Sequence, residues 1–292
     1  MRSNAPFSRA GIMSRLLILL GTVLLSTLLL LIIVSVANLL LPPELSTNSN
    51  PGSMKAMQLL SALFTFILPA ILMAFLVSRH PAHYLELTRT PNAGKALLTL
   101  VSMVMMIPFM NIIIEWNQNI RLPESMQALE FWMLRQEEEM GELTLRMLEA
   151  HSVWGWLFNL FLVGVVASFS EEIFFRGMLQ NLFRDKWHNR HLAIWLAAFA
   201  FSMFHMQFYG LIPRMLLGAY FGYLLVWTRS LWIPIIAHFA NNAIALLQIW
   251  LQQRGTDPQV WVESNLGSQT WIWGAMSVIL FVLTAAFIRR RS

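Results

Sequence analysis

The sequence predicts an all-α fold, a polytopic helical bundle that crosses a membrane about eight times. Two observations support this fold class. First, 57% of the 292 residues are hydrophobic and only 12% are charged, with a mean hydropathy of +0.58, which is outside the range of soluble globular domains. Second, the hydrophobic residues gather in long stretches, and about 20 helical residues cover the roughly 30 Å hydrocarbon core of a bilayer.

Eight such stretches follow one another along the chain. The first has an apolar core longer than that of a signal peptide, so we expect it to remain as a permanent span. The fourth is unusually long for a single span. In order, the predicted spans cover about residues 16–41, 57–77, 96–114, 153–183, 192–208, 211–227, 231–251 and 271–288.

The chain shows no internal repeat, so we expect residues 1–292 to form a single membrane domain. The one sizeable insertion is 115–152, where apolar residues recur at helical spacing from about Pro123 or Ser125. We expect an amphipathic helix on the outer surface or packed over the bundle. Its other face is acidic, and the sequence leaves open whether this face is only solvated or forms a lid that controls substrate entry.

Basic residues predict the orientation. With the N-terminus in the cytoplasm, most Lys and Arg fall in inner segments, as the positive-inside rule requires. An integral membrane protein, in a bacterial inner membrane and with both termini cytoplasmic, is therefore expected, and nucleic acid is not an expected partner. The chain has no cysteine, which excludes disulfides and thiolate chemistry. The inner set is Arg2, Arg9, Arg15, Arg79, Arg89, Lys95, Arg184, Lys186, Arg190, Arg229, Arg289, Arg290 and Arg291, and the outer loops hold Lys55, Arg121, Arg135, Arg146, Arg214 and Arg254.

Three of the predicted spans carry polar residues in an apolar setting, where each charge costs roughly 2.5 to 3.5 kcal/mol at the bilayer centre. Residues four apart share a helix face. Counting about 1.5 Å per residue from the cytoplasmic ends of the spans places four polar residues at similar depths, roughly 14 to 22 Å: Glu171, His205, His238 and Asn242. We therefore expect one buried polar layer. The four-residue pairs are Glu172 with Arg176, Phe201 with His205, and His238 with Asn242.

The two adjacent glutamates point about 100° apart on a helix. The favoured division pairs Glu172 with Arg176 and leaves Glu171 facing the bundle interior, and the reverse assignment remains an alternative. A carboxylate beside a histidine can activate water, and a second histidine with an amide can stabilise an oxyanion. Alternatively, Glu171, His205 and His238 could hold a divalent metal such as zinc. The sequence does not choose between these mechanisms.

These residues resemble the three motifs of the CPBP family of intramembrane proteases, the CAAX-protease and bacteriocin-processing or Abi family. Glu171 to Arg176 matches EExxxR, Phe201 to His205 matches FxxxH, and His238 to Asn242 matches HxxxN. The resemblance covers about residues 153–250. It implies that Glu171 and His205 activate water, that His238 and Asn242 stabilise the oxyanion, and that Glu172, Arg176 and Phe201 support them.

The resemblance implies an intramembrane endopeptidase of the glutamate or metallo type that cleaves a membrane-associated peptide or protein. Two other functions use the same polar residues. A proton-coupled transporter would relay protons through Glu and His, although the chain lacks the inverted repeat common in transporters. A non-catalytic protein could instead bind membrane proteins through the cavity.

Overall fold

The computed structural model describes the chain except residues 1–4, 8–9, 41, 43–49, 257–269 and 291–292. Over the described residues the fold is a bundle of helices without strands, as predicted. Seven of these helices are long and apolar enough to cross a bilayer. The chain is therefore an integral membrane protein.

The seven spans follow the predicted stretches closely. Two of them contain π-helical segments, and the label η marks π-helical and 3₁₀ segments alike. The spans are α1 (Ile12–Leu40); α2 (Pro51–Ser61), η2 (Ala62–Ile67) and α3 (Leu68–Val77) in one run; α5 (Ala93–Gln118); α7 (Val153–Asn159), η4 (Leu160–Ala167), α8 (Ser168–Glu172), η5 (Ile173–Gln180) and α9 (Asn181–Trp187) in one run; η6 (Phe208–Gly210, 3₁₀) with α11 (Leu211–Thr228); α12 (Trp232–Gln252); and α14 (Thr270–Arg290).

About eight spans were expected, but the described residues form seven, because the stretch predicted at 192–208 is too short to be one. It is α10 (Arg190–Phe204), with only 15 residues, which rise about 22 Å and so fall short of the hydrocarbon thickness. The chain then turns at Met206, whose φ is 51°, and α11 packs back against α10. His205 directly follows the last residue of this short helix.

Side-chain caps explain where several helices begin. Asn50, Asn92, Ser152 and Asn189 each accept a hydrogen bond from a backbone N–H in the first turn of the following helix. These residue types satisfy N–H groups that have no partner inside the helix. The sequence therefore sets the start of the second, third and fourth spans and of α10.

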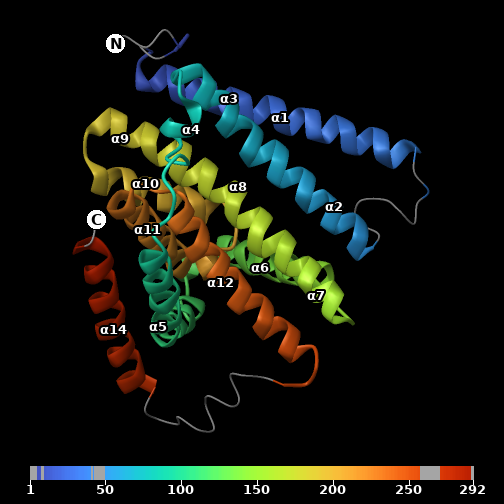
Figure 1. Cartoon of the computed structure of the whole chain (residues 1–292). Coiled ribbons are helices and arrows are strands. Elements are labelled where there is room, and N and C mark those ends of the chain that lie inside the picture. Colours follow the sequence, from blue (N-terminus) through green and yellow to red (C-terminus); the bar gives the residue numbers. More distant parts are fainter. Residues whose placement is uncertain (1–4, 8–9, 41, 43–49, 257–269, 291–292) are drawn as a thin grey trace.

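The fourth span runs through the middle of the bundle, with α1 and α3 on one side and α10 to α12 on the other (Figure 1). Its η4 and α8 segments pack against α12, and η5 packs against α3 and α10. Met73, Ile173, Met178 and Leu182 are buried in one shared core. This central position lets the glutamates of α8 face residues of α12.

The insertion forms the predicted helix. A short 3₁₀ turn, η3 (Glu124–Met126), leads into α6 (Gln127–Leu148), which packs against α2 and η6. The Trp132 and Phe208 ring centroids lie 5.3 Å apart, and the backbone N–H of Tyr209 donates to Glu137 Oε2 at 3.3 Å. The helix α6 thus lies against the turn that joins α10 to α11. A short helix, α4 (Pro81–Tyr84), lies at the opposite end of the bundle.

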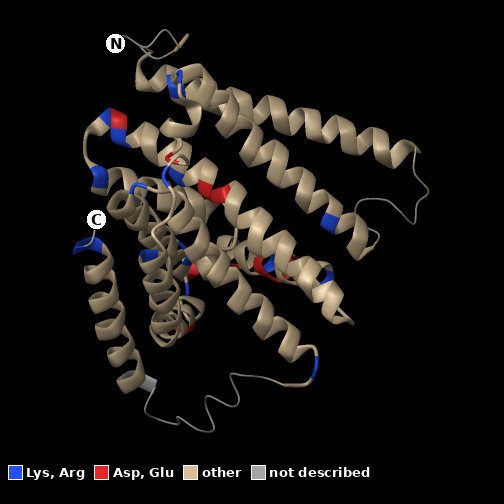
Figure 2. Ribbon diagram, in the orientation of Figure 1, with Lys and Arg blue, Asp and Glu red and all other residues tan. Residues whose placement is uncertain are grey.

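The beginning of α1 and the end of α14 lie at the same end of the bundle (Figure 1). Lys and Arg gather at this end (Figure 2), and the last turns of α9 and α14 hold Arg184, Lys186 and Arg290. This agrees with the charge pattern from which the orientation was predicted. Three residues of the inner basic set, Arg2, Arg9 and Arg291, lie outside the described residues. Arg214 departs from that pattern, since it lies in the first turn of α11 and not in an outer loop.

Candidate active site

The local structure of the fourth span differs from a plain α-helix on both sides of the glutamates. The five residues of α8 lie between the π-helical segments η4 and η5. Such segments are rare and often mark functional sites, because they change the register of the side chains relative to an α-helix. The register of Glu171 and Glu172 therefore depends on both segments, and the hydrophobic pattern gives no sign of them.

Glu172 and Arg176 form a fully buried ion pair, as predicted. Arg176 Nη1 donates to Glu172 Oε1 at 2.8 Å, and both side chains are 0% exposed. The Nη2 group of Arg176 donates to the carbonyl of Gly218 at 3.1 Å, and the guanidinium lies 4.4 Å from the Phe201 ring centroid. These contacts hold Glu172 in a single position.

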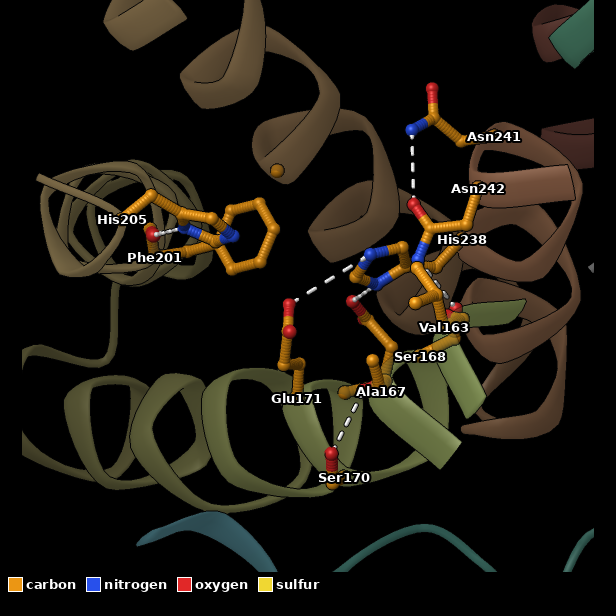
Figure 3. A network of polar contacts seen from close by, with 12 residues as sticks. Val163, Ala167, Ser168, Ser170, Glu171, Phe201, His205, His238, Asn241 and Asn242 are labelled. Carbon is orange, nitrogen blue, oxygen red and sulfur yellow. Dashed lines mark hydrogen bonds and ion pairs between the residues drawn. The ribbon is translucent and has the colours of Figure 1, made fainter. Parts of the chain in front are cut away.

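The His238 ring reaches both glutamates, and Figure 3 shows its contact with Glu171. Its Nδ1 is 2.8 Å from Glu172 Oε1, and its Nε2 is 3.8 Å from Glu171 Oε2. Because the Glu172 carboxylate accepts a hydrogen bond, we infer that Nδ1 carries a proton. The ring also stacks on Phe221, with centroids 5.2 Å apart. The ring is thus fixed with Nε2 towards Glu171.

Glu171 has a different environment from its neighbour. Its side chain is 13% exposed, whereas that of Glu172 is 0% exposed. None of the described residues hydrogen-bonds its Oε2 atom. The carboxylate points towards the space beside His238 (Figure 3). The divergence of the two glutamates predicted from the helix geometry is therefore present: Glu171 is partly exposed beside His238 and Glu172 is fully buried, although the Oε2 atom of each lacks a hydrogen-bond partner among the described residues.

His205 lies on the other side of this space (Figure 3). Its Nδ1 is 2.9 Å from the carbonyl of Phe201, which can only accept, so we infer that Nδ1 carries the proton. The Phe201 ring contacts both histidines, with centroid distances of 5.1 Å to His205 and 5.7 Å to His238. Within the described part of the chain no ion pair joins His205 to Glu171, so the two predicted partners face one space without direct contact.

Asn242 joins two helices. Its Nδ2 group donates to the carbonyl of Val163 at 2.9 Å and to Ser168 Oγ at 3.3 Å. Its Oδ1 accepts from Asn241 Nδ2 at 3.4 Å. Both amide hydrogens are therefore directed at the fourth span, and this differs from the amide donor that the motifs imply for an oxyanion.

A cavity of about 380 Å³ lies beside this centre, lined by the two histidines but not by either glutamate of α8. Its polar wall includes His205, His238 and Asn242, and Met103 and Met106 of α5 belong to its apolar wall. Sequence reasoning missed further polar residues in this lining, among them Glu137, Arg214 and Asn241. Arg214 could have been found, because it is a charge inside a predicted span, the same criterion that identified Glu171.

The sequence also suggested a metal site of Glu171, His205 and His238. In the ranges that the structure describes, no group of three or more His, Cys, Asp or Glu side chains is close enough to hold a metal ion. A zinc ion needs at least three protein ligands at about 2.0 to 2.3 Å. These residues, as they are arranged, do not fit such an ion, and we derive no step through one.

The fold and the site together define an integral membrane protein with a buried carboxylate and histidine centre. Residues 153–244 match the family described as type II CAAX prenyl endopeptidase Rce1-like. This match over residues 153–244 agrees with the resemblance to the CPBP family that the motifs show.

One curated relative is the uncharacterized protein YpbD of Bacillus subtilis (strain 168), which is 32% identical over 89 residues. That alignment covers 29% of this chain, and the chain spans 42% of the relative's length. No solved structure matches the chain.

Proposed function

We propose that this protein is an intramembrane endopeptidase that hydrolyses a peptide bond of a membrane-associated peptide or protein. The observation that carries the proposal is the His238 ring held 2.8 Å from Glu172 and 3.8 Å from Glu171. A match to a peptidase family over residues 153–244 supports it. The apolar wall of the cavity, with Met103 and Met106, suits the apolar segments of such substrates.

In the proposed reaction Glu171 is the general base. It has an unused acceptor atom, and it takes a proton from a water molecule as the water oxygen bonds to the substrate carbonyl carbon. With its proton on Nδ1, His205 has an acceptor at Nε2, which helps to hold that water. When the C–N bond breaks, Glu171 returns the proton to the leaving nitrogen. The products are a new carboxylate and a new amine.

His238 is the proposed donor to the oxyanion. Glu172 accepts from Nδ1, so the ring can present Nε2–H beside Glu171 when both nitrogens are protonated. In this scheme Glu172 and Arg176 are positioning residues, because they act through His238. Asn242 is also a positioning residue, since its amide holds η4 and α8 against α12.

The test is cleavage of a lipid-anchored peptide library by purified protein in liposomes, read by mass spectrometry. Wild type is expected to cleave, and Glu171→Gln to lose at least about a hundredfold in rate, because a general base contributes roughly 10² to 10⁴. The matched control is Glu138→Gln on the exposed side of α6, which should cleave like wild type. Undiminished cleavage by Glu171→Gln would refute the proposal.

The same assay addresses the alternatives that the sequence left open. A chelator arm tests the metal alternative: activity that is lost and then restored by zinc would replace the scheme above. Proton uptake by the same liposomes tests the transporter. If wild type moves protons down a gradient and cleaves nothing, the chain is a carrier; if it binds the peptides and does neither, it is a non-catalytic binder.

A further inference from the structure

Arg214 is a cationic residue of the cavity wall that the proposed reaction does not use. It lies in the first turn of α11 and lines the same cavity as His205 and His238. A charge at this depth is costly unless an opposite charge compensates it. The question is therefore what compensates the guanidinium.

The protein contacts of Arg214 are neutral. Nη1 donates to the carbonyl of Gln207 at 3.4 Å, and Nη2 donates to Gln207 Oε1 at 2.9 Å. Within the described residues no carboxylate forms an ion pair with it, in contrast to Arg176, which is paired with Glu172 at 2.8 Å. A guanidinium has five N–H donors, so the remaining donors of Arg214 are available.

Two carboxylates act on Arg214 through space, Glu137 of α6 and Glu171 of α8. Neither makes an ion pair with it. Glu137 lines the cavity as well, but its Oε2 accepts from the backbone N–H of Tyr209. Arg214 is thus a cation in the cavity wall whose nearest anions are held elsewhere.

We propose that Arg214 is a specificity-determining residue that binds a carboxylate of the peptide substrate. The inference rests on the proposed function and concerns the same cavity. A planar guanidinium matches a carboxylate through two parallel N–H···O bonds. Because Arg214 and His205 line one cavity, a carboxylate held by Arg214 anchors the adjoining peptide near Glu171. The carboxylate can come from the substrate's C-terminus or from an Asp or Glu side chain.

The test is a binding measurement that does not depend on cleavage. Three fluorescent, lipid-anchored peptides share one sequence and differ in charge: the first ends in a free carboxylate, the second in an amide, and the third in an amide with one internal Glu. Full-length Glu171→Gln protein is titrated with each. We expect at least one carboxylate peptide to bind about tenfold or more tightly than the uncharged amide, and the one that does identifies the source.

When Arg214→Gln is combined with Glu171→Gln, the difference in affinity between the carboxylate and amide peptides should disappear. Arg214→Lys should keep part of that difference, because lysine retains the charge without the paired donors. Glu137→Gln should strengthen binding of the carboxylate peptide, because one competing anion is removed. The matched control is Arg254→Gln, which changes an arginine that lies outside the cavity on the Trp250 ring. The difference should persist in that control.

Equal binding of all three peptides would overturn the inference, and so would an equal loss for all three in Arg214→Gln, which would mean a general structural role. The two proposals fail separately. Cleavage by wild type without a preference for carboxylate removes only the role of Arg214. Carboxylate-dependent binding in a protein that never cleaves removes only the peptidase.

Discussion

Adjacent glutamates in α8 have different partners, and their substitutions should therefore have different effects. Glu172 compensates Arg176 and holds His238, whereas Glu171 is partly exposed and lies 3.8 Å from His238 Nε2. The sequence could predict this division, because adjacent helical residues diverge and acid before base at a spacing of four favours an ion pair. It could not predict that His238 would reach both carboxylates, since this depends on how α12 packs against α8.

Glu172→Gln should reduce stability, whereas Glu171→Gln should not. Removing one partner of a buried ion pair leaves the other charge without compensation, at a cost of about 3 to 5 kcal/mol. Thermal unfolding of the purified variants in detergent measures this. A Glu172→Gln protein as stable as wild type, or a Glu171→Gln protein equally destabilised, would contradict the assigned contacts.

Asn242→Ala should also lower stability. The substitution removes two hydrogen bonds to the fourth span and leaves Val163 O and Ser168 Oγ without this partner, at a cost of about 1 to 3 kcal/mol. Ser168→Ala removes only the weaker of the two and should cost less. The measurement is unfolding temperature together with the cleavage rate. If the rate of Asn242→Ala falls while its stability stays at the wild-type level, the amide acts on the oxyanion and is not a positioning group.

At the scale of elements, the site depends on the α10–α11 hairpin as much as on the fourth span. Hydropathy predicted both helices, but α10 ends after 15 residues, a boundary that hydrophobicity does not mark because the apolar residues continue beyond it. The π-helical segments around α8 were likewise not predictable, because they leave no periodic signature in the sequence. Both features set the positions of the polar residues without changing which residues are polar.

The small residues of α11 allow the hairpin to pack closely. A Cβ added at Gly222 would lie 2.6 Å from Gln180 Oε1 and 2.9 Å from Ile194 Cγ2. Gly222→Ala should therefore cost about 1 to 3 kcal/mol through overpacking. The matched control is Gly141→Ala in α6, where no atom lies within 4 Å, and alanine should be neutral or stabilising by up to about 1 kcal/mol. Thermal unfolding distinguishes them, and equal effects would argue against the close contact.

At the scale of the whole molecule, composition and hydropathy were sufficient to predict an all-helical membrane bundle. The motifs placed Glu171, Glu172, Arg176, His205 and His238 around one space. The sequence did not reveal Arg214 as part of the cavity, because counting it as a loop residue concealed its position in α11. The predicted span at 211–227 contains Arg214, so a charge inside a span was the available signal, but that the residue lines the cavity follows only from the packed hairpin.

The predicted orientation can be measured directly, because the chain has no native cysteine. We expect Lys186→Cys, at the end rich in Lys and Arg, to face the cytoplasm, and Glu138→Cys on α6 to face outwards. A membrane-impermeant maleimide applied to intact spheroplasts should therefore label only the second variant. Labelling of Lys186→Cys alone would reverse the orientation.

The account depends most on one step: a water molecule activated by Glu171 attacks the substrate carbonyl directly, in a site shielded by the bundle. Cleavage of a lipid-anchored peptide in water enriched in heavy oxygen, followed by mass spectrometry of both fragments, tests this most directly. A single turnover by wild-type protein should place one heavy oxygen in the new carboxylate and none in the amine fragment, with no adduct on the protein. A covalent peptide–protein intermediate, or the same label at the same rate in Glu171→Gln, would contradict it.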